Sequence, residues 1–130
     1  MEHRGPRARR LLLVDDHDRA RQGLRELLED VEPTLQVETA ATAAEAVRRV
    51  GARRPDLVLL DYRMPGTSAA ETIAALHGMA SDLPVIVLTG DPTAEVEREV
   101  LAAGAAACLG KAGNVFELIE LIDRCTRRTS

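Results

Sequence analysis

Short apolar runs recur along the chain at wide intervals, and longer segments with helical periodicity separate them. Runs rich in Leu, Val and Ile occupy residues 11–14, 57–60 and 85–88, and a weaker run occupies residues 105–109. Uninterrupted apolar runs of this length are typical of strands that are buried on both faces of a parallel sheet. Residues 35–40 alternate apolar with polar side chains, which predicts a fifth strand at an edge of the sheet.

The segments between these runs place apolar residues on one face of a helix. We expect helices over residues 19–29, 43–53, 68–77, 93–103 and 114–127. Ser68 and Glu71 have the spacing of a capping box, and Gly104 suits the left-handed residue that ends a helix. Strands that alternate with helices require right-handed crossovers and place helices on both faces of the sheet. The expected fold class is therefore α/β with a doubly wound parallel sheet.

The length and composition bound the domain organisation and the function. The 130 residues are enough for one domain, which we expect over residues 10–128 after a flexible basic arm over residues 1–9. A net charge of −4 and only two aromatic residues, Tyr62 and Phe116, give little support to nucleic-acid binding. The apolar run at residues 11–14 is too short for a signal peptide or a membrane span, so we expect a cytoplasmic protein. Cys108 and Cys125 lack metal-site spacing and are expected to be free thiols.

Polar side chains follow the expected strands at the point where each strand ends. They are Asp15 and Asp16, Asp61, Thr89 and Lys111. A role in a turn would explain any one of them. However, the carboxyl ends of parallel strands form the edge at which such sheets bind ligands. Four separate segments would therefore deliver three carboxylates, a hydroxyl and an ammonium to one site.

Three neighbouring carboxylates need a compensating charge. Each close pair repels by about 4 kcal/mol at an effective dielectric constant of ~20, so either one carboxyl is protonated or a cation is bound. Oxygen ligands favour Mg²⁺. A carboxylate beside Mg²⁺, with Lys and Thr donors facing it, is equipped to accept a phosphoryl group. We interpret Asp61 as the nucleophile, and His17, directly after the acidic pair, as an exposed residue at the start of a helix.

The motifs resemble the receiver domain of two-component response regulators over almost the whole chain. They read LLLVDD, LVLLDYRMPG, VIVLTG and AGAAACLGK, in that order. The stretch DDHDRARQGLRELL resembles the subgroup whose receivers usually precede a helix-turn-helix output domain. The resemblance implies a flavodoxin-like sheet in the strand order 2-1-3-4-5 with five helices. It also implies a phosphoacceptor signalling switch.

The same resemblance implies a role for each site residue. Asp61 would accept the phosphoryl group from the phosphohistidine of a sensor kinase, from a phosphotransfer protein or from a small phosphodonor. Asp16 and Asp61 would ligate Mg²⁺ directly, Asp15 would act through a bound water, and the backbone carbonyl of Arg63 would complete the protein ligands. The site residues that would contact the phosphoryl group are Lys111, through its ammonium, and Thr89, through its hydroxyl.

The chain departs from the family pattern where the signal is usually transmitted. Cys108 stands where most receivers carry Tyr or Phe, and Ala112 follows Lys111 where many carry Pro. An ordinary trans peptide is expected before Ala112, because a non-proline cis bond costs about 3 kcal/mol. The output stays open between a partner protein, a phosphorelay, an output domain outside these 130 residues and a homodimer formed on phosphorylation. We expect neither membrane contact nor turnover of an external substrate.

Two other functions compete with this interpretation. A Mg²⁺-dependent phosphohydrolase of the haloacid-dehalogenase type also uses an aspartyl nucleophile, but it needs a second Asp two positions later, where this chain has Arg63. A degenerate receiver that acts only as an interaction module would not need the complete set of Asp, Thr and Lys residues. The sequence therefore favours the phosphoacceptor over both alternatives.

Overall fold

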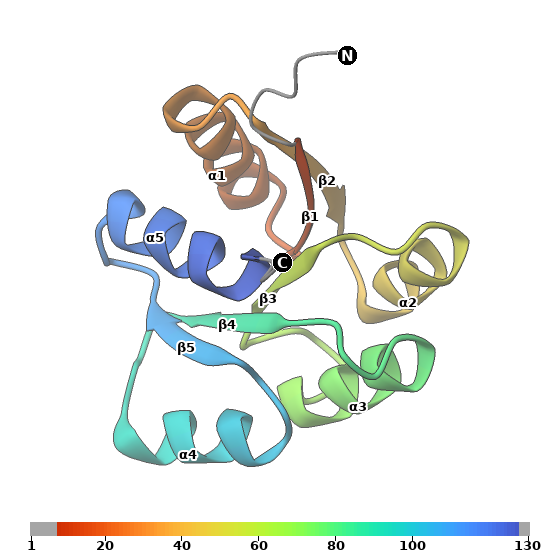
Figure 1. The fold of residues 1–130 in the computed structure, drawn as a ribbon. Coiled ribbons are helices and arrows are strands. Elements are labelled where there is room, and N and C mark those ends of the chain that lie inside the picture. Colours follow the sequence, from red (N-terminus) through yellow and green to blue (C-terminus); the bar gives the residue numbers. More distant parts are fainter. Residues whose placement is uncertain (1–7, 128–130) are drawn as a thin grey trace.

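The computed structural model describes residues 8–127, in which five strands alternate with five helices (Figure 1). The strands are β1 (Arg9–Val14), β2 (Leu35–Ala40), β3 (Leu57–Asp61), β4 (Val85–Thr89) and β5 (Ala107–Gly110). The helices are α1 (Asp18–Val31), α2 (Ala43–Ala52), α3 (Ala69–Met79), α4 (Ala94–Ala102) and α5 (Val115–Thr126). All neighbouring strands pair in parallel, in the order β2-β1-β3-β4-β5. The predicted fold class and strand order are confirmed.

Helices cover both faces of the sheet. Helices α1 and α5 pack on one face, and α2, α3 and α4 pack on the other (Figure 1). The central strand β3 separates two apolar clusters, because Leu59 belongs to the α1–α5 side and Leu60 to the α2–α4 side. Strand order reverses between β1 and β3, so the fold directs ligands to the carboxyl ends of these two strands.

The predicted capping box at the start of α3 and the predicted glycine after α4 are present. The amide of Glu71 donates to Ser68 Oγ at 3.0 Å and the amide of Ser68 donates to Glu71 Oε1 at 2.9 Å, which is the reciprocal pair of a capping box. Thr93 caps α4 by accepting from the amide of Val96. Gly104 follows α4 with φ of +112°, a conformation that favours glycine.

Strand β1 begins earlier than the apolar run predicts. Arg9 and Arg10 lie in the strand, with Arg9 in an ion pair with Asp123 and Arg10 Nη2 3.2 Å from Glu38 Oε1. These ion pairs compensate the charged side chains, so the strand extends beyond its apolar residues. Residues 1–7 of the expected basic arm lie outside the described residues.

Other boundaries also differ from the prediction. The first helix extends to Val31, and the last strand occupies Ala107–Gly110 rather than residues 105–109. The amide of Ala105 donates to the carbonyl of Val100, which ties this residue to the end of α4 instead of to the sheet. The helices between residues 8 and 127 all lack the length and hydropathy needed to cross a membrane.

Candidate functional site

Strand register brings the predicted acidic residues to one edge of the sheet. Val14 pairs with Leu60, so Asp15 and Asp61, the next residue of each strand, emerge side by side at the carboxyl ends of β1 and β3. Asp15 is 5% exposed and Asp61 is 3% exposed. Burial of two carboxyl groups is unfavourable without compensating partners. This edge of the sheet therefore requires a bound ligand or a compensating positive charge.

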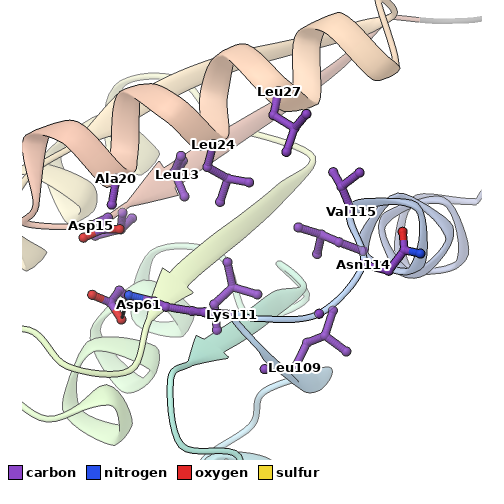
Figure 2. A pocket seen from close by; sticks show the side chains of 15 residues that line it. Leu13, Asp15, Ala20, Leu24, Leu27, Asp61, Leu109, Lys111, Asn114 and Val115 are labelled. Atoms are coloured by element: carbon purple, nitrogen blue, oxygen red, sulfur yellow. Dashed lines mark ion pairs between the residues drawn. The ribbon is translucent and has the colours of Figure 1, made fainter.

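Lys111 supplies one compensating charge. Figure 2 shows its side chain extending from the loop after β5 to Asp61, where Nζ lies 2.9 Å from Oδ1. The backbone holds this loop in place, since the amide of Lys111 donates to the carbonyl of Thr89 at 2.7 Å. A mostly apolar cavity of about 230 Å³ lies between α1 and α5, and Asp15, Asp61 and Lys111 line it (Figure 2). The ion pair therefore lies at the edge of a mostly apolar cavity.

The other oxygen of Asp61 has no partner in the described part of the chain. Within residues 8–127, Oδ2 is buried and accepts no hydrogen bond, whereas Oδ1 also lies 3.4 Å from the amide of Arg63. Buried polar atoms in native proteins nearly always have a partner. An unpartnered carboxylate oxygen at a ligand edge therefore fits either a bound cation or an incoming electrophile.

Burial dominates the ionisation of Asp61. Desolvation raises the pKa of this carboxyl above its ordinary value, and the negative charge of Asp15 acts in the same direction. The ion pair with Lys111 and the amide of Arg63 lower the pKa, but they do not cancel the desolvation. A cation beside Asp61 would favour the ionised form, which is the form that can act as a nucleophile.

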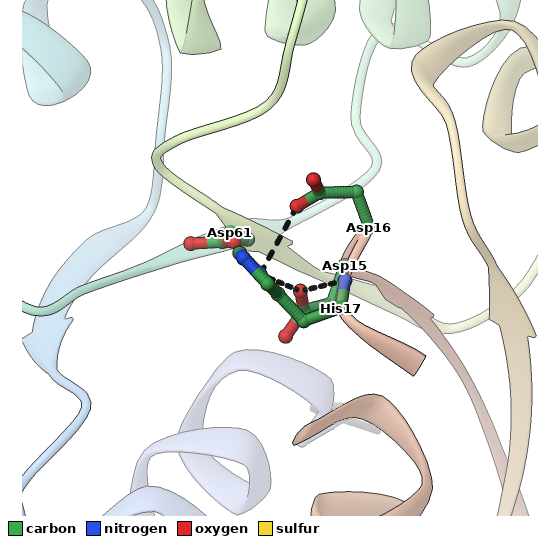
Figure 3. Close-up of side chains that lie close together, drawn as sticks. All are labelled: Asp15, Asp16, His17 and Asp61. Atoms are coloured by element: carbon green, nitrogen blue, oxygen red, sulfur yellow. Dashed lines mark hydrogen bonds and ion pairs between the residues drawn. The ribbon is translucent and has the colours of Figure 1, made fainter. Parts of the chain in front are cut away.

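Four side chains form a cluster with the donor atoms of a metal site. Asp15, Asp16, His17 and Asp61 each place one ligand atom within 4.8 Å of all the others (Figure 3). Carboxylate oxygens are the ligands that hard divalent cations prefer. The three Asp residues that the sequence placed in one site are thus brought together, and the group can hold a metal ion.

His17 is the member of this cluster that sequence reasoning missed. It was expected to be an exposed residue at the start of a helix, and it is indeed the N-cap of α1, with a side chain that is 66% exposed. Its ring nevertheless turns toward the acidic pair, with Nδ1 3.3 Å from Asp15 Oδ1 and 3.2 Å from Asp16 Oδ1. Its position directly after two site carboxylates was the available signal.

Thr89 and Arg63 lie where the sequence placed them. Thr89 is 1% exposed at the end of β4, and its hydroxyl oxygen accepts from the amide of Asp91 at 3.1 Å. Its hydroxyl proton can still be donated to another acceptor. Arg63 lies in the turn after β3, two residues beyond Asp61. The roles of the Thr89 hydroxyl and of the Arg63 carbonyl stay predictions.

Tyr62 connects the site to α4, a link that the sequence did not indicate. Its hydroxyl donates to Glu99 Oε1 at 2.6 Å, and its ring packs against the apolar cluster on the α2–α4 side. Cys108 of β5 packs against the same cluster. The residue after Asp61 is therefore joined to α4 by a hydrogen bond, on the sheet face where the family usually has an aromatic residue in β5.

A sequence model of the response regulator receiver domain matches residues 11–123. Among relatives, the response regulator UvrY of Escherichia coli O6:H1 is 34% identical over 112 residues, and the response regulator GacA of Pseudomonas viridiflava is 31% identical over 113 residues. These matches cover 86% and 87% of this chain but 51% and 53% of the relatives. The chain therefore spans about half the length of these relatives.

Solved structures resemble the fold over most of its length. A CheY-like receiver domain protein from Methanospirillum hungatei JF-1 has a TM-score of 0.79 and 29% identity, covering 89% of this chain and 91% of that one. A LuxR-family two-component response regulator from Aurantimonas sp. SI85-9A1 has a TM-score of 0.86 and 28% identity, covering 92% of this chain and 85% of that one.

Proposed function

The chain belongs to the response regulator receiver domain family, the phosphoacceptor switches of two-component signalling, and we propose that Asp61 is its phosphoacceptor. One observation carries the assignment: Asp61 is buried at the ligand edge, its Oδ2 has no partner among residues 8–127, and its Oδ1 is held by the ammonium of Lys111. Asp61 thus presents a carboxylate oxygen that no described protein group occupies, at the edge of the sheet where ligands bind.

The proposed reaction is an in-line displacement at phosphorus. A bond forms between a carboxylate oxygen of Asp61 and the phosphorus atom, while the bond from phosphorus to the donor breaks and its electron pair stays on the donor. The donor is the imidazole of a phosphohistidine or the acyl group of a small acyl phosphate. The product is an acyl phosphate on Asp61. Because the transferred group carries negative charge throughout, catalysis here is mainly charge neutralisation and positioning.

The proposed metal is Mg²⁺, held by Asp15, Asp16 and Asp61 with the carbonyl of Arg63. When bound, it would neutralise the charge that develops on the phosphoryl oxygens. The unpartnered Oδ2 and the all-oxygen set of these residues fit such an ion. Of the chain's own groups, Lys111 would pair with a phosphoryl oxygen and Thr89 would donate its hydroxyl proton to another.

The proposed partners follow from the family. A sensor histidine kinase or a phosphotransfer protein would supply the phosphoryl group in the cytoplasm. Because the matches cover only about half the length of these relatives, we propose that phosphorylation controls an output domain or a partner in the manner of those regulators, with a homodimer as one form of output. No external substrate would be turned over, and no nucleic acid or membrane would be bound by this domain.

Intact-mass analysis tests the acceptor. The parent, Asp61→Asn and Asp30→Asn are incubated with acetyl phosphate and Mg²⁺, the last being a matched change of an exposed carboxylate on α1. We expect the mass of one phosphoryl group on the parent and on Asp30→Asn, and none on Asp61→Asn. Equal labelling of all three proteins would contradict the assignment. Sustained hydrolysis of a general phosphatase substrate would instead favour the phosphohydrolase.

A further inference from the structure

The imidazole of His17 has the geometry of a metal ligand. Its Nδ1 lies 3.3 Å from Asp15 Oδ1 and 3.2 Å from Asp16 Oδ1. Two ligand atoms bound at about 2.1 Å from one ion, at angles between octahedral and tetrahedral, are about 3.0 to 3.4 Å apart. The nitrogen therefore lies at a distance from each of the two oxygens that suits neighbouring ligands of a single ion.

A second observation points to a ligand at this place. Asp61 belongs to the same cluster, is 3% exposed, and keeps Oδ2 without a partner among the described residues. A buried carboxylate oxygen with no protein partner is costly unless a cation or another ligand satisfies it. The cluster thus offers a nitrogen together with carboxylate oxygens from three residues (Figure 3).

Capping of α1 does not explain the orientation of the His17 ring, whose Nδ1 instead lies within hydrogen-bonding distance of Asp15 Oδ1. As the N-cap residue of α1 it makes no side-chain capping hydrogen bond, so the imidazole is not used to begin the helix. The start of α1 is held by other bonds: the amide of His17 donates to the side-chain Oδ1 of Asp15 at 2.9 Å, and the carbonyl of His17 accepts from the amide of Arg21. A mere ion pair from so exposed a ring would contribute little.

We propose that His17 is a nitrogen ligand of the acidic cluster, so that the site binds ions such as Co²⁺ and Zn²⁺ more tightly than Mg²⁺. The reason is ligand chemistry: imidazole nitrogen suits late first-row metals, whereas Mg²⁺ prefers oxygen. The inference rests on the proposed function, because it concerns the same site. It adds a ligand residue, and it predicts a stronger preference for late first-row ions than three carboxylates alone would give.

Metal titration of the full chain tests the proposal. Co²⁺ and Mg²⁺ affinities are measured by calorimetry on the parent, on His17→Ala and on His17→Gln, which keeps a polar side chain but loses the imidazole nitrogen. His3→Ala is the matched control, because it removes another imidazole of the same chain. We expect both His17 variants to lose at least about tenfold in Co²⁺ affinity, with Mg²⁺ affinity unchanged within about twofold and His3→Ala like the parent.

Proton NMR of the Co²⁺-loaded parent gives a readout that does not depend on a variant. Coordination by Nδ1 should produce one hyperfine-shifted imidazole N–H resonance, from Nε2, that disappears in D₂O. Absence of this resonance from the loaded parent, or Co²⁺ affinity unaltered by both His17 changes, would overturn the proposal.

Phosphorylation separates this inference from the proposed function. The His17 variants are labelled with acetyl phosphate and Mg²⁺ and analysed by intact mass. Labelling that persists while Co²⁺ affinity is unchanged overturns the role of His17 alone. A parent that binds Co²⁺ through an imidazole but accepts no phosphoryl group overturns the acceptor assignment alone.

Discussion

At the scale of single residues, opposing electrostatic effects act on the ionisation of Asp61. Burial and the charge of Asp15 disfavour its ionised form, while the ammonium of Lys111 favours it. The balance leaves the pKa of Asp61 raised, so the metal-free domain carries a carboxylate in an environment that destabilises its charge. Such sites commonly reduce the stability of the fold in exchange for reactivity.

Asp61→Asn should therefore stabilise the metal-free protein. The amide keeps the size of the side chain but removes the buried charge, and Lys111, whose side chain is 37% exposed, can be solvated without its partner. We expect the free energy of unfolding in EDTA to rise by about 1 kcal/mol, measured by urea denaturation. Asp30→Asn, on the exposed face of α1, should stay within about 0.5 kcal/mol of the parent. A destabilised Asp61→Asn would show that the ion pair outweighs the burial.

The gain from Asp61→Asn should depend on pH in a defined direction. Because the pKa of Asp61 is raised on folding, the folded chain binds this proton more tightly than the unfolded chain does, and its stability falls as pH rises. The difference between variant and parent should be smallest near the ordinary pKa of 3.8 and should grow to a plateau above the raised value. Urea denaturation in EDTA from about pH 4 to pH 7 measures it. A difference that shrinks with rising pH would contradict the raised pKa.

The positions of the reactive residues could be predicted from the sequence better than the arrangement of the residues around them. Asp15, Asp61 and Thr89 could be placed because each directly follows an apolar run, and parallel strands align such positions at one edge. The orientation of the His17 ring could not be predicted, because it depends on how the loop between β1 and α1 folds back. Arg9 was misassigned to the arm because its partner, Asp123, is distant in sequence.

At the scale of elements, the link between the turn after β3 and α4 is the feature with most bearing on signalling. Cys108 cannot supply the aromatic ring that most receivers carry in β5, but Tyr62 contributes a ring to the same apolar cluster and hydrogen-bonds to Glu99 of α4. A shift of the turn that follows Asp61 would therefore be transmitted to α4. The contact was not predictable, since Tyr62 and Glu99 are 37 residues apart.

Tyr62→Phe should loosen α4 without disrupting the fold. It removes one hydrogen bond and keeps the ring, so we expect a loss of about 0.5 to 1 kcal/mol in the free energy of unfolding. Hydrogen exchange should quicken in α4 but not in α2, which lacks this contact. Glu99→Ala should have the same effect, and the double variant should lose less than the sum of the two. Additive losses would show that the pair is not coupled.

Titration of the single tyrosine gives an independent check of the same contact. The carboxylate of Glu99 raises the pKa of Tyr62 above its ordinary value, chiefly by accepting its hydroxyl proton in a hydrogen bond. In Glu99→Gln the charge is absent, so the titration midpoint should fall. Ultraviolet absorbance of tyrosinate measures it without interference, because the chain has one Tyr and no Trp. An unchanged midpoint would mean that the hydrogen bond is absent in solution.

The capping box of α3 gives a second prediction at this scale. Ser68→Ala removes the acceptor for the amide of Glu71, and we expect a loss of about 1 kcal/mol in the free energy of unfolding. Ser81→Ala is the matched control, because Ser81 is exposed in a turn outside the helices. Urea denaturation of both variants measures the difference. Equal stability of the two variants would show that the cap contributes nothing.

At the scale of the whole molecule, the apolar runs determined which parts of the fold could be predicted from the sequence. They identified the buried strands because a sheet covered on both faces requires continuous apolar sequence, as the fully buried β3 illustrates. They did not determine strand order, which came from the family resemblance, because periodicity carries no information on which strands are neighbours. Arg10, like Arg9, was not predicted to lie in a strand, because it is charged and falls outside the apolar run. A partner distant in sequence stabilises it in the strand.

The sheet should make the two apolar clusters unfold together. Leu59 and Leu60 are adjacent in β3 and fully buried, yet they face α1 and α5 on one side and α2, α3 and α4 on the other. Alanine at either position should lower the free energy of unfolding by about 2 to 5 kcal/mol. Leu101→Ala, on the exposed face of α4, should change it by less than about 0.5 kcal/mol.

Cooperativity is measured by comparing two probes in each variant. Far-UV circular dichroism reports on all five helices, whereas fluorescence of Tyr62 reports on the α2–α4 side. Because the backbone of β3 is shared by both clusters, loss of packing on one side removes the surface against which the other packs. The two transitions should therefore coincide in both Leu variants. Separate transitions in Leu59→Ala, with circular dichroism changing first, would show that the α1–α5 layer unfolds independently of the α2–α4 side.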